Sequence, residues 1–164
     1  MQGVGRRPTE LIAVTTSALR LSGAAPYKPS MMWSDEEAPT LDQFEALARD
    51  CFAKLPAEFR QLVADIVMRI EDFPDEAVCA EMEIEDPFEL TGLYQGVDLA
   101  HKSSAGVAEG PDMIFLYRRP ILDEWAGGGH TLRELITHIL VHEIGHHFGL
   151  SDEATHEIEE SEVE

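Results

Sequence analysis

Residues 131–149 constrain the fold of this chain more than any other segment, because they combine sharp helix boundaries with an apolar surface. Thr131 and Glu134 fit a capping box at the start of a helix, and Gly149 fits the glycine that often follows a helix end. The apolar residues between these ends lie around most of the helical circumference: Leu132, Leu135, Ile136, Ile139, Leu140, Val141 and Ile144. A helix that is apolar on nearly all sides is largely buried. The segment therefore predicts one long central helix.

The second half of this helix carries polar residues at metal-ligand spacing. His142 and His146 are four residues apart, so their imidazoles lie on one helix face, about one turn from each other. Gly149 ends the helix and lets the chain turn back, and Asp152 follows six residues after His146. Two imidazoles and a carboxylate are donors that Zn²⁺ accepts. We therefore expect Zn²⁺ to be held by His142, His146 and Asp152.

The number of ligands indicates a catalytic site rather than a structural one. Three protein ligands leave one position for water, whereas structural zinc sites are closed by four. Glu143 is rotated by about 100° from His142, which brings its carboxylate near that water without making it a ligand. Zinc lowers the pKa of bound water to about 7. Glu143 is then the predicted catalytic residue, a general base that takes the water's proton and passes it to a leaving amine.

The pattern His142-Glu143-x-x-His146-x-x-Gly149-x-x-Asp152 resembles the extended zinc signature of the metzincin-type peptidases, with Asp152 in place of the third histidine. The doubled His146-His147 resembles the minimal zincin-like metallopeptidase family more closely. The likeness covers roughly residues 41–155 and includes two further segments, Gly92-Leu93-Tyr94-Gln95-Gly96 and Tyr117-Arg118-Arg119-Pro120.

This resemblance implies an α+β fold of the minimal zincin-like type, a small mixed sheet with an active-site helix that carries HExxH. It implies zinc at His142, His146 and Asp152, with Glu143 catalytic. The implied activity is that of a zinc metallopeptidase, which hydrolyses a peptide or protein substrate.

Charge is unevenly distributed along the chain, and this suggests where the folded domain begins. The first 30 residues hold four basic residues and one acidic residue, a local charge of +3. Because the whole chain has a net charge of −20, the remaining residues carry −23. We expect residues 1–35 to lie outside the fold, either as a disordered tail or as an extension upstream of a true start at Met31 or Met32. The metallopeptidase domain then spans residues 36–155, and residues 156–164 form an acidic tail.

Other segments predict the remaining elements. Thr40 and Gln43 form a capping box for a helix that ends before Pro56, where a short second helix begins. The hydrophobic patterns predict strands over residues 67–73, 92–97 and 113–117, and a short helix over 121–125. Zincin sheets bind peptide along an edge strand, and we assign that role to residues 113–117.

Some polar residues have no settled role. His147 points about 100° away from His146, so packing or support of a ligand is favoured over ligation. His138 is favoured as a core histidine. Tyr94, Tyr117 and Arg118 remain alternatives for a group that stabilises an oxyanion.

Composition excludes some function classes. Only 12 basic residues stand against 32 acidic ones, and such a charge disfavours nucleic acids and anionic membranes as partners. Two cysteines, Cys51 and Cys79, form no disulfide framework, which favours the cytoplasm. Two alternatives to a peptidase remain: a non-catalytic interaction module stabilised by zinc, and a metal-dependent endoribonuclease. The pattern leaves the oligomeric state open.

Overall fold

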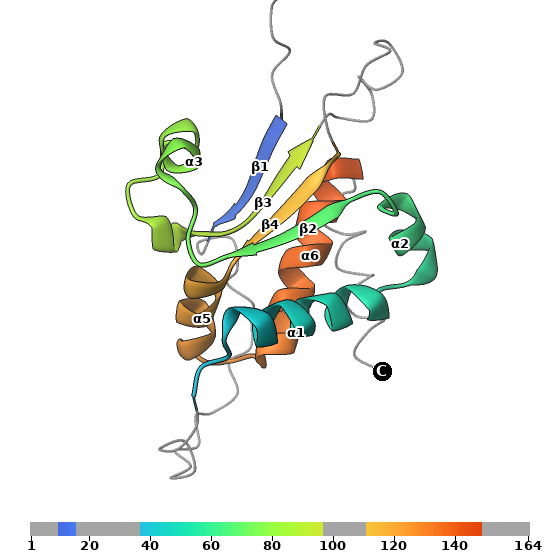
Figure 1. The fold of residues 1–164 in the computed structure, drawn as a ribbon, viewed down its shortest axis with the longest axis horizontal. Helices are drawn as coiled ribbons and strands as arrows, with labels where there is room; N and C mark the ends of the chain where they lie inside the picture. The colour runs from blue at the N-terminus through green and yellow to red at the C-terminus, as the bar shows by residue number, and fades with distance from the viewer. Residues whose placement is uncertain (1–9, 16–36, 97–110, 149–164) are drawn as a thin grey trace, which may run out of the picture.

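A four-stranded sheet and the long helix behind it form the centre of the fold (Figure 1). The computed structural model describes residues 10–15, 37–96 and 111–148. Its elements in chain order are β1 (Glu10–Thr15), α1 (Leu41–Lys54), α2 (Ala57–Leu62), β2 (Val67–Glu71), α3 (Glu76–Glu81), the 3₁₀ helix η3 (Pro87–Glu89), β3 (Leu90–Gly96), β4 (Met113–Tyr117), α5 (Arg118–Ala126) and α6 (Leu132–Phe148). The mixture of helices and a small sheet confirms the α+β prediction.

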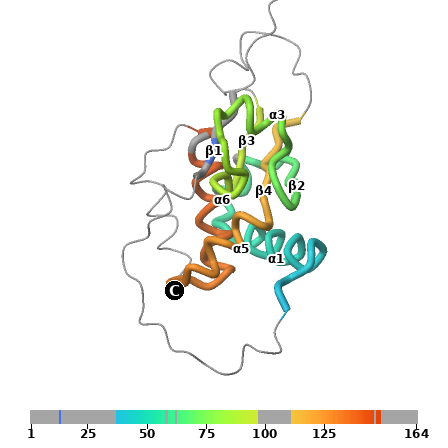
Figure 2. Tube along the Cα trace, turned by 90° about the vertical axis from the view of Figure 1, so that its left-hand side faces the viewer, coloured from blue at the N-terminus to red at the C-terminus, as the bar shows by residue number. Residues whose placement is uncertain are grey.

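The sheet has the strand order β1-β3-β4-β2 and is mixed. β3 pairs antiparallel with both β1 and β4, while β2 pairs parallel with β4. Figure 2 shows β1 and β2 at opposite sides of the sheet. β4 therefore lies in the interior, and the prediction that residues 113–117 form an edge strand is wrong.

The side chains of β4 explain its position. Ile114 and Leu116 are buried on the face toward α6, while Tyr117 is buried on the opposite face. A strand that buries apolar side chains on both faces gains most from having a neighbour on each side. The continuous apolar run of residues 113–117 was thus the signal of an interior strand.

β1 corrects the expectation for the N-terminal segment. Residues 10–15 pair with β3 over the register from Glu10↔Gly96 to Thr15↔Leu90, so this part of residues 1–35 belongs to the sheet. The sequence Glu-Leu-Ile-Ala-Val-Thr is rich in β-branched and apolar residues, which favour strands. The local charge balance, on which the expectation rested, carries no information about this short run.

Two apolar clusters fill the two faces of the sheet. The larger lies between the sheet and helices α1 and α6, and it includes Phe44, Tyr94, Ile114, Ile139 and Ile144. The smaller lies on the other face and joins Leu90, Leu93 and Tyr117 to partly buried residues of the α3 region, among them Val78 and Met82. Figure 1 shows α3 on the side of the sheet away from α6. Apolar side chains of the central strands β3 and β4 are therefore buried on both faces of the sheet.

The predicted helices and strands are largely confirmed. α1 begins with the expected capping box, in which Thr40 and Gln43 bond each other's backbone amides at 2.9 and 3.3 Å. The strands expected at 67–73 and 92–97 are found at Val67–Glu71 and Leu90–Gly96. α3 was not predicted, because it has six residues and none of them is buried, so it lacks an apolar stripe.

No helix of the described residues is long and apolar enough to cross a membrane.

Candidate metal centre

α6 provides the backbone for the candidate metal centre, and its start is fixed by a capping box. The Thr131 backbone amide donates to Glu134 Oε2 at 2.7 Å, and the Glu134 amide donates to Thr131 Oγ1 at 3.2 Å. The helix then runs without a break to Phe148. Its fully buried residues include Ile136, Ile139, Leu140, Val141 and Ile144. The helix is thus held on several sides, as its composition predicts.

All residues of the HExxH pattern lie within α6. The unbroken helix puts His142 and His146 one turn apart on the same side, an arrangement that suits two nitrogen donors to one zinc ion. The His142 side chain is half-buried. The side chain of His146 and the whole of Asp152 lie outside the described residues, and so does Gly149. Within the part of the chain that the structure describes, no three His, Cys, Asp or Glu side chains are grouped as a metal site would require.

Glu143 lies on a different side of α6 and faces the sheet. Its side chain is 0% exposed and lies next to β3 at Gly92. A Cβ atom at Gly92 would stand 2.8 Å from Ile139 Cγ2, well inside van der Waals contact. Only glycine therefore permits the close approach of α6 and β3 at this point. Ile139 and Glu143, one turn apart, share the row of α6 that contacts this strand.

The next residue in that row is His147, which lies in a buried polar cluster. His147 Nε2 is 3.4 Å from the Tyr94 hydroxyl and 3.9 Å from Asp112 Oδ2. The His147 and Tyr94 rings pack with their centroids 4.3 Å apart. His147 is thus engaged by β3 and by the residue that precedes β4, which places it among packing contacts, as the sequence favoured.

β3 accommodates this cluster through a second glycine. A Cβ atom at Gly96 would collide with the Tyr94 hydroxyl and the Asp112 carboxylate. Gly92, Tyr94 and Gly96 are every second residue of β3, so all three lie on one face of the strand. The sequence analysis gave no role to Asp112 or to these glycines. The i, i+2, i+4 spacing of Gly-x-Tyr-x-Gly was the signal that one face of a strand is kept open.

His138 supports His142 from the preceding turn. Their ring centroids are 4.6 Å apart with an interplanar angle of 66°, an edge-to-face contact, and His138 is buried. His138, His142 and His146 occupy successive turns of one row of α6. This row lies on the side of α6 opposite Arg133, whose carbonyl accepts a hydrogen bond from the Cys51 thiol of α1 at 3.8 Å.

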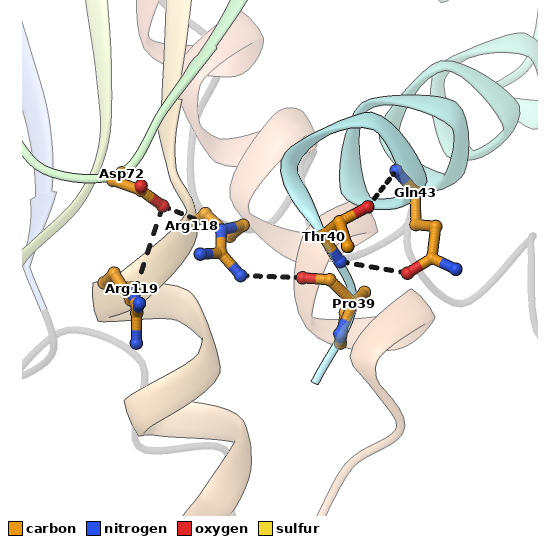
Figure 3. A network of polar contacts seen from close by, with 6 residues as sticks. All are labelled: Pro39, Thr40, Gln43, Asp72, Arg118 and Arg119. Atoms are coloured by element: carbon orange, nitrogen blue, oxygen red, sulfur yellow. Dashed lines mark hydrogen bonds and ion pairs between the residues drawn. The ribbon is translucent and has the colours of Figure 1, made fainter. Parts of the chain in front are cut away.

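Two of the candidates for oxyanion stabilisation, Tyr117 and Arg118, are engaged elsewhere in the fold. Tyr117 is buried on the face of the sheet opposite α6, and this burial raises the pKa of its hydroxyl. Arg118 donates through Nε to Asp72 Oδ1 and through Nη1 to the Pro39 carbonyl, both at 2.7 Å (Figure 3). Arg118 therefore ties the end of β2 to the start of α1. Of the three candidates, only Tyr94 lies on the face of the sheet toward α6.

Comparison with known proteins agrees with this arrangement. The family model described as zincin-like metallopeptidase matches residues 63–162, which contain β2, β3, β4, α5 and α6. No curated protein matches the chain. The matched region covers more than half of the sequence and includes the complete HExxH pattern. The chain belongs to the zincin-like metallopeptidase family.

Proposed function

We propose that this protein is a zinc-dependent metallopeptidase in which His142, His146 and Asp152 hold the metal and Glu143 is the general base. The observation that carries the proposal is the division of α6 into two rows. One row bears His142 and His146, and the adjacent row bears Glu143 against β3. Hydrolysis by zinc-activated water requires the metal ligands and the general base to be held at fixed relative positions, and one rigid helix can do this.

Bound zinc would supply a Lewis acid that polarises the scissile carbonyl and makes water acidic. The Glu143 carboxylate accepts a proton from the attacking water as the new carbon–oxygen bond forms. It then gives this proton to the amide nitrogen as the carbon–nitrogen bond breaks, so that an amine and a carboxylic acid leave. The close approach of Gly92 holds the Glu143 side chain in place while the proton moves.

The substrate in this proposal is an extended peptide bound along a sheet edge. Since β4 is interior, the described edges are β1 and β2. α6 packs against β1 as well as β3, whereas α1 packs against β2. The histidine row of α6 faces away from α1, which makes β1 the edge strand on the side of the histidines. A peptide added there would gain main-chain hydrogen bonds.

The substitution Glu143→Gln tests the proposal. It keeps the size of the side chain and removes the base, so we expect peptide turnover to fall by about 10²–10⁴-fold while zinc content stays the same. Glu134→Gln, at an exposed position of the same helix, is the matched control and should leave turnover unchanged. Purified protein without zinc, or a Glu143→Gln variant with wild-type turnover, would show the proposal to be wrong.

One observation favours a second candidate, a zinc-stabilised interaction module without catalysis: the Glu143 side chain is 0% exposed. In that case chelation of zinc and the substitution His142→Ala would both lower the melting temperature, because metal binding contributes to folding. Glu143→Gln would then change no activity of the protein, which separates the two functions.

A further inference from the structure

β2 is an edge strand whose free side faces away from the metal centre. Among the described residues it pairs only with β4. The Val67 amide donates to the Asp112 carbonyl at 2.9 Å, so Val67 and every second residue after it turn their backbone groups toward β4. Met68 and Ile70 therefore present N–H and C=O groups outward. An edge of this kind pairs readily with another strand.

The approach to this edge is open on the helix side. A cavity of about 200 Å³ lies between α1 and the sheet there, and it is lined by Arg49, Phe52, Ile66, Met68, Ile114 and Leu140. Met68 and Ile70 are only partly buried, unlike the corresponding residues of β4. α1 therefore covers the helix-facing side of β2 only in part.

The exposed charged side chains of β2 follow a self-complementary order. Val67 and Phe73 are each 37% exposed, and the charged residues Arg69 and Glu71 lie exposed between them. Val67, Arg69 and Glu71 have the same parity and so point to one face of β2, whereas Phe73 lies two residues beyond the end of the strand. Phe73 also stacks edge-to-face on the exposed Phe88, at 5.0 Å between centroids. Arg69 and Glu71 lie on either side of Ile70, so reversing the strand places each charge opposite a charge of the other sign.

We propose that β2 pairs with β2 of a second copy of this chain, antiparallel and centred on Ile70. In this register Ile70 lies opposite Ile70 of the second copy. The outward N–H and C=O groups of the two residues form two backbone hydrogen bonds. Arg69 of each copy lies opposite Glu71 of the other, so the interface contains two such pairs. These pairs occupy non-hydrogen-bonded positions, where opposing side chains are closest. The interface is isologous, as a two-fold dimer requires.

Neighbouring registers lack this complementarity. Centring the pair on Arg69 puts two guanidinium groups opposite each other, which is destabilising. Centring it on Met68 puts Arg69 opposite Val67 and leaves the charges without partners. The pairing would join two sheets into one and leave β1 and the histidine row of α6 outside the interface. It does not depend on the proposed peptidase activity.

Charge reversal tests the register. Arg69→Glu puts acids opposite acids, and Glu71→Arg puts bases opposite bases, so each variant alone should raise the dimer dissociation constant by about tenfold. The double variant restores opposite charges and should dimerise as the wild type does. An equimolar mixture of the two single variants should form a heterodimer, since each supplies what the other lacks.

Sedimentation velocity of the full chain at about 0.15 M salt measures these equilibria, with long-range repulsion between the acidic protomers screened. Circular dichroism melts of each variant check that the exposed substitutions leave the fold intact. A wild-type chain that stays monomeric at every concentration overturns the proposal, whether the edge stays bare or another part of the chain covers it. Single variants that dimerise like the wild type, or a mixture that associates no more than its components, overturn it as well.

Discussion

Gly92 of β3 leaves the space in which the Glu143 side chain of α6 lies: a Cβ atom on Gly92 would stand 3.3 Å from Glu143 Oε1. The proposed base thus fits in its position because β3 has no side chain at Gly92. Its position depends on β3 as much as on the HExxH helix.

The substitution Gly92→Ala should therefore impair catalysis more than it impairs metal binding. Relief of the 2.8 Å contact with Ile139 would shift α6 and Glu143, and a misplacement of about 1 Å costs about 10²-fold in rate. We expect kcat to fall by about this factor, KM and zinc content to stay near wild type, and the unfolding free energy to fall by about 1–3 kcal/mol.

Leu93→Ala is the matched control for this experiment. Leu93 follows Gly92 but is buried on the opposite face of the sheet, so its truncation costs about 2–5 kcal/mol of stability without touching Glu143. At a temperature where both variants are folded, only Gly92→Ala should lose turnover. Equal losses of kcat would assign the effect to general destabilisation.

Arg118 should stabilise the fold through the planar geometry of its guanidinium group. It bonds Asp72 and the Pro39 carbonyl at 2.7 Å each, and a lysine ammonium cannot reproduce both bonds from one planar group. Since a hydrogen bond to a charged group contributes about 1.5–3 kcal/mol, Arg118→Lys should lower the unfolding free energy by about 2 kcal/mol. Urea denaturation of the two proteins measures this difference. The exposed Arg119, 3.9 Å from Asp72, is the control, and Arg119→Lys should change it by less than about 0.5 kcal/mol.

The capping box of α6 should make stability depend on pH at the acidic end. The hydrogen bond from the Thr131 amide holds the pKa of Glu134 below its ordinary value. The stabilisation is complete above the ordinary pKa of a glutamate and is lost as the pH falls through the lowered value, where the folded state becomes protonated. The stability difference between wild type and Glu134→Gln should therefore shrink as the pH is lowered below about 4.3. A difference that stays constant over that interval would contradict this role.

The two cysteines should react with thiol reagents at very different rates. Cys51 is 2% exposed, and burial raises the pKa of its thiol, so little thiolate is available. Cys79 is only partly buried. In native protein we expect one fast-reacting thiol, which Cys79→Ser abolishes and Cys51→Ser leaves in place. A fast phase that survives in Cys79→Ser would show that Cys51 is accessible.

The parts of the fold that were predicted correctly are those fixed by local signals. The capping residues Thr40 and Thr131 act within one helical turn, so the sequence predicts the starts of α1 and α6 without reference to the rest of the chain. The order of the strands, by contrast, depends on contacts between segments that are distant in the sequence. Residues 16–89 separate β1 from β3, and no local pattern encodes which strands become neighbours.

The candidate site divides in the same way. His142, Glu143 and His146 were predicted because their spacing along one helix has direct geometric meaning. The contacts of Glu143 with Gly92, and of His147 with Asp112, join α6 to distant segments of the chain. These contacts exist only once the sheet has formed, so the residues that position the Glu143 side chain were found from the structure.

The two rows of α6 also restrict how this chain can evolve. One residue inserted between Ile139 and His142 would rotate the remainder of the helix by about 100°, because each residue advances the helix by that angle. Glu143 would leave its place against Gly92, and the histidines would swing toward the sheet. Substitutions along α6 can be absorbed one at a time, whereas a change in its length would separate the proposed base from its setting in a single step.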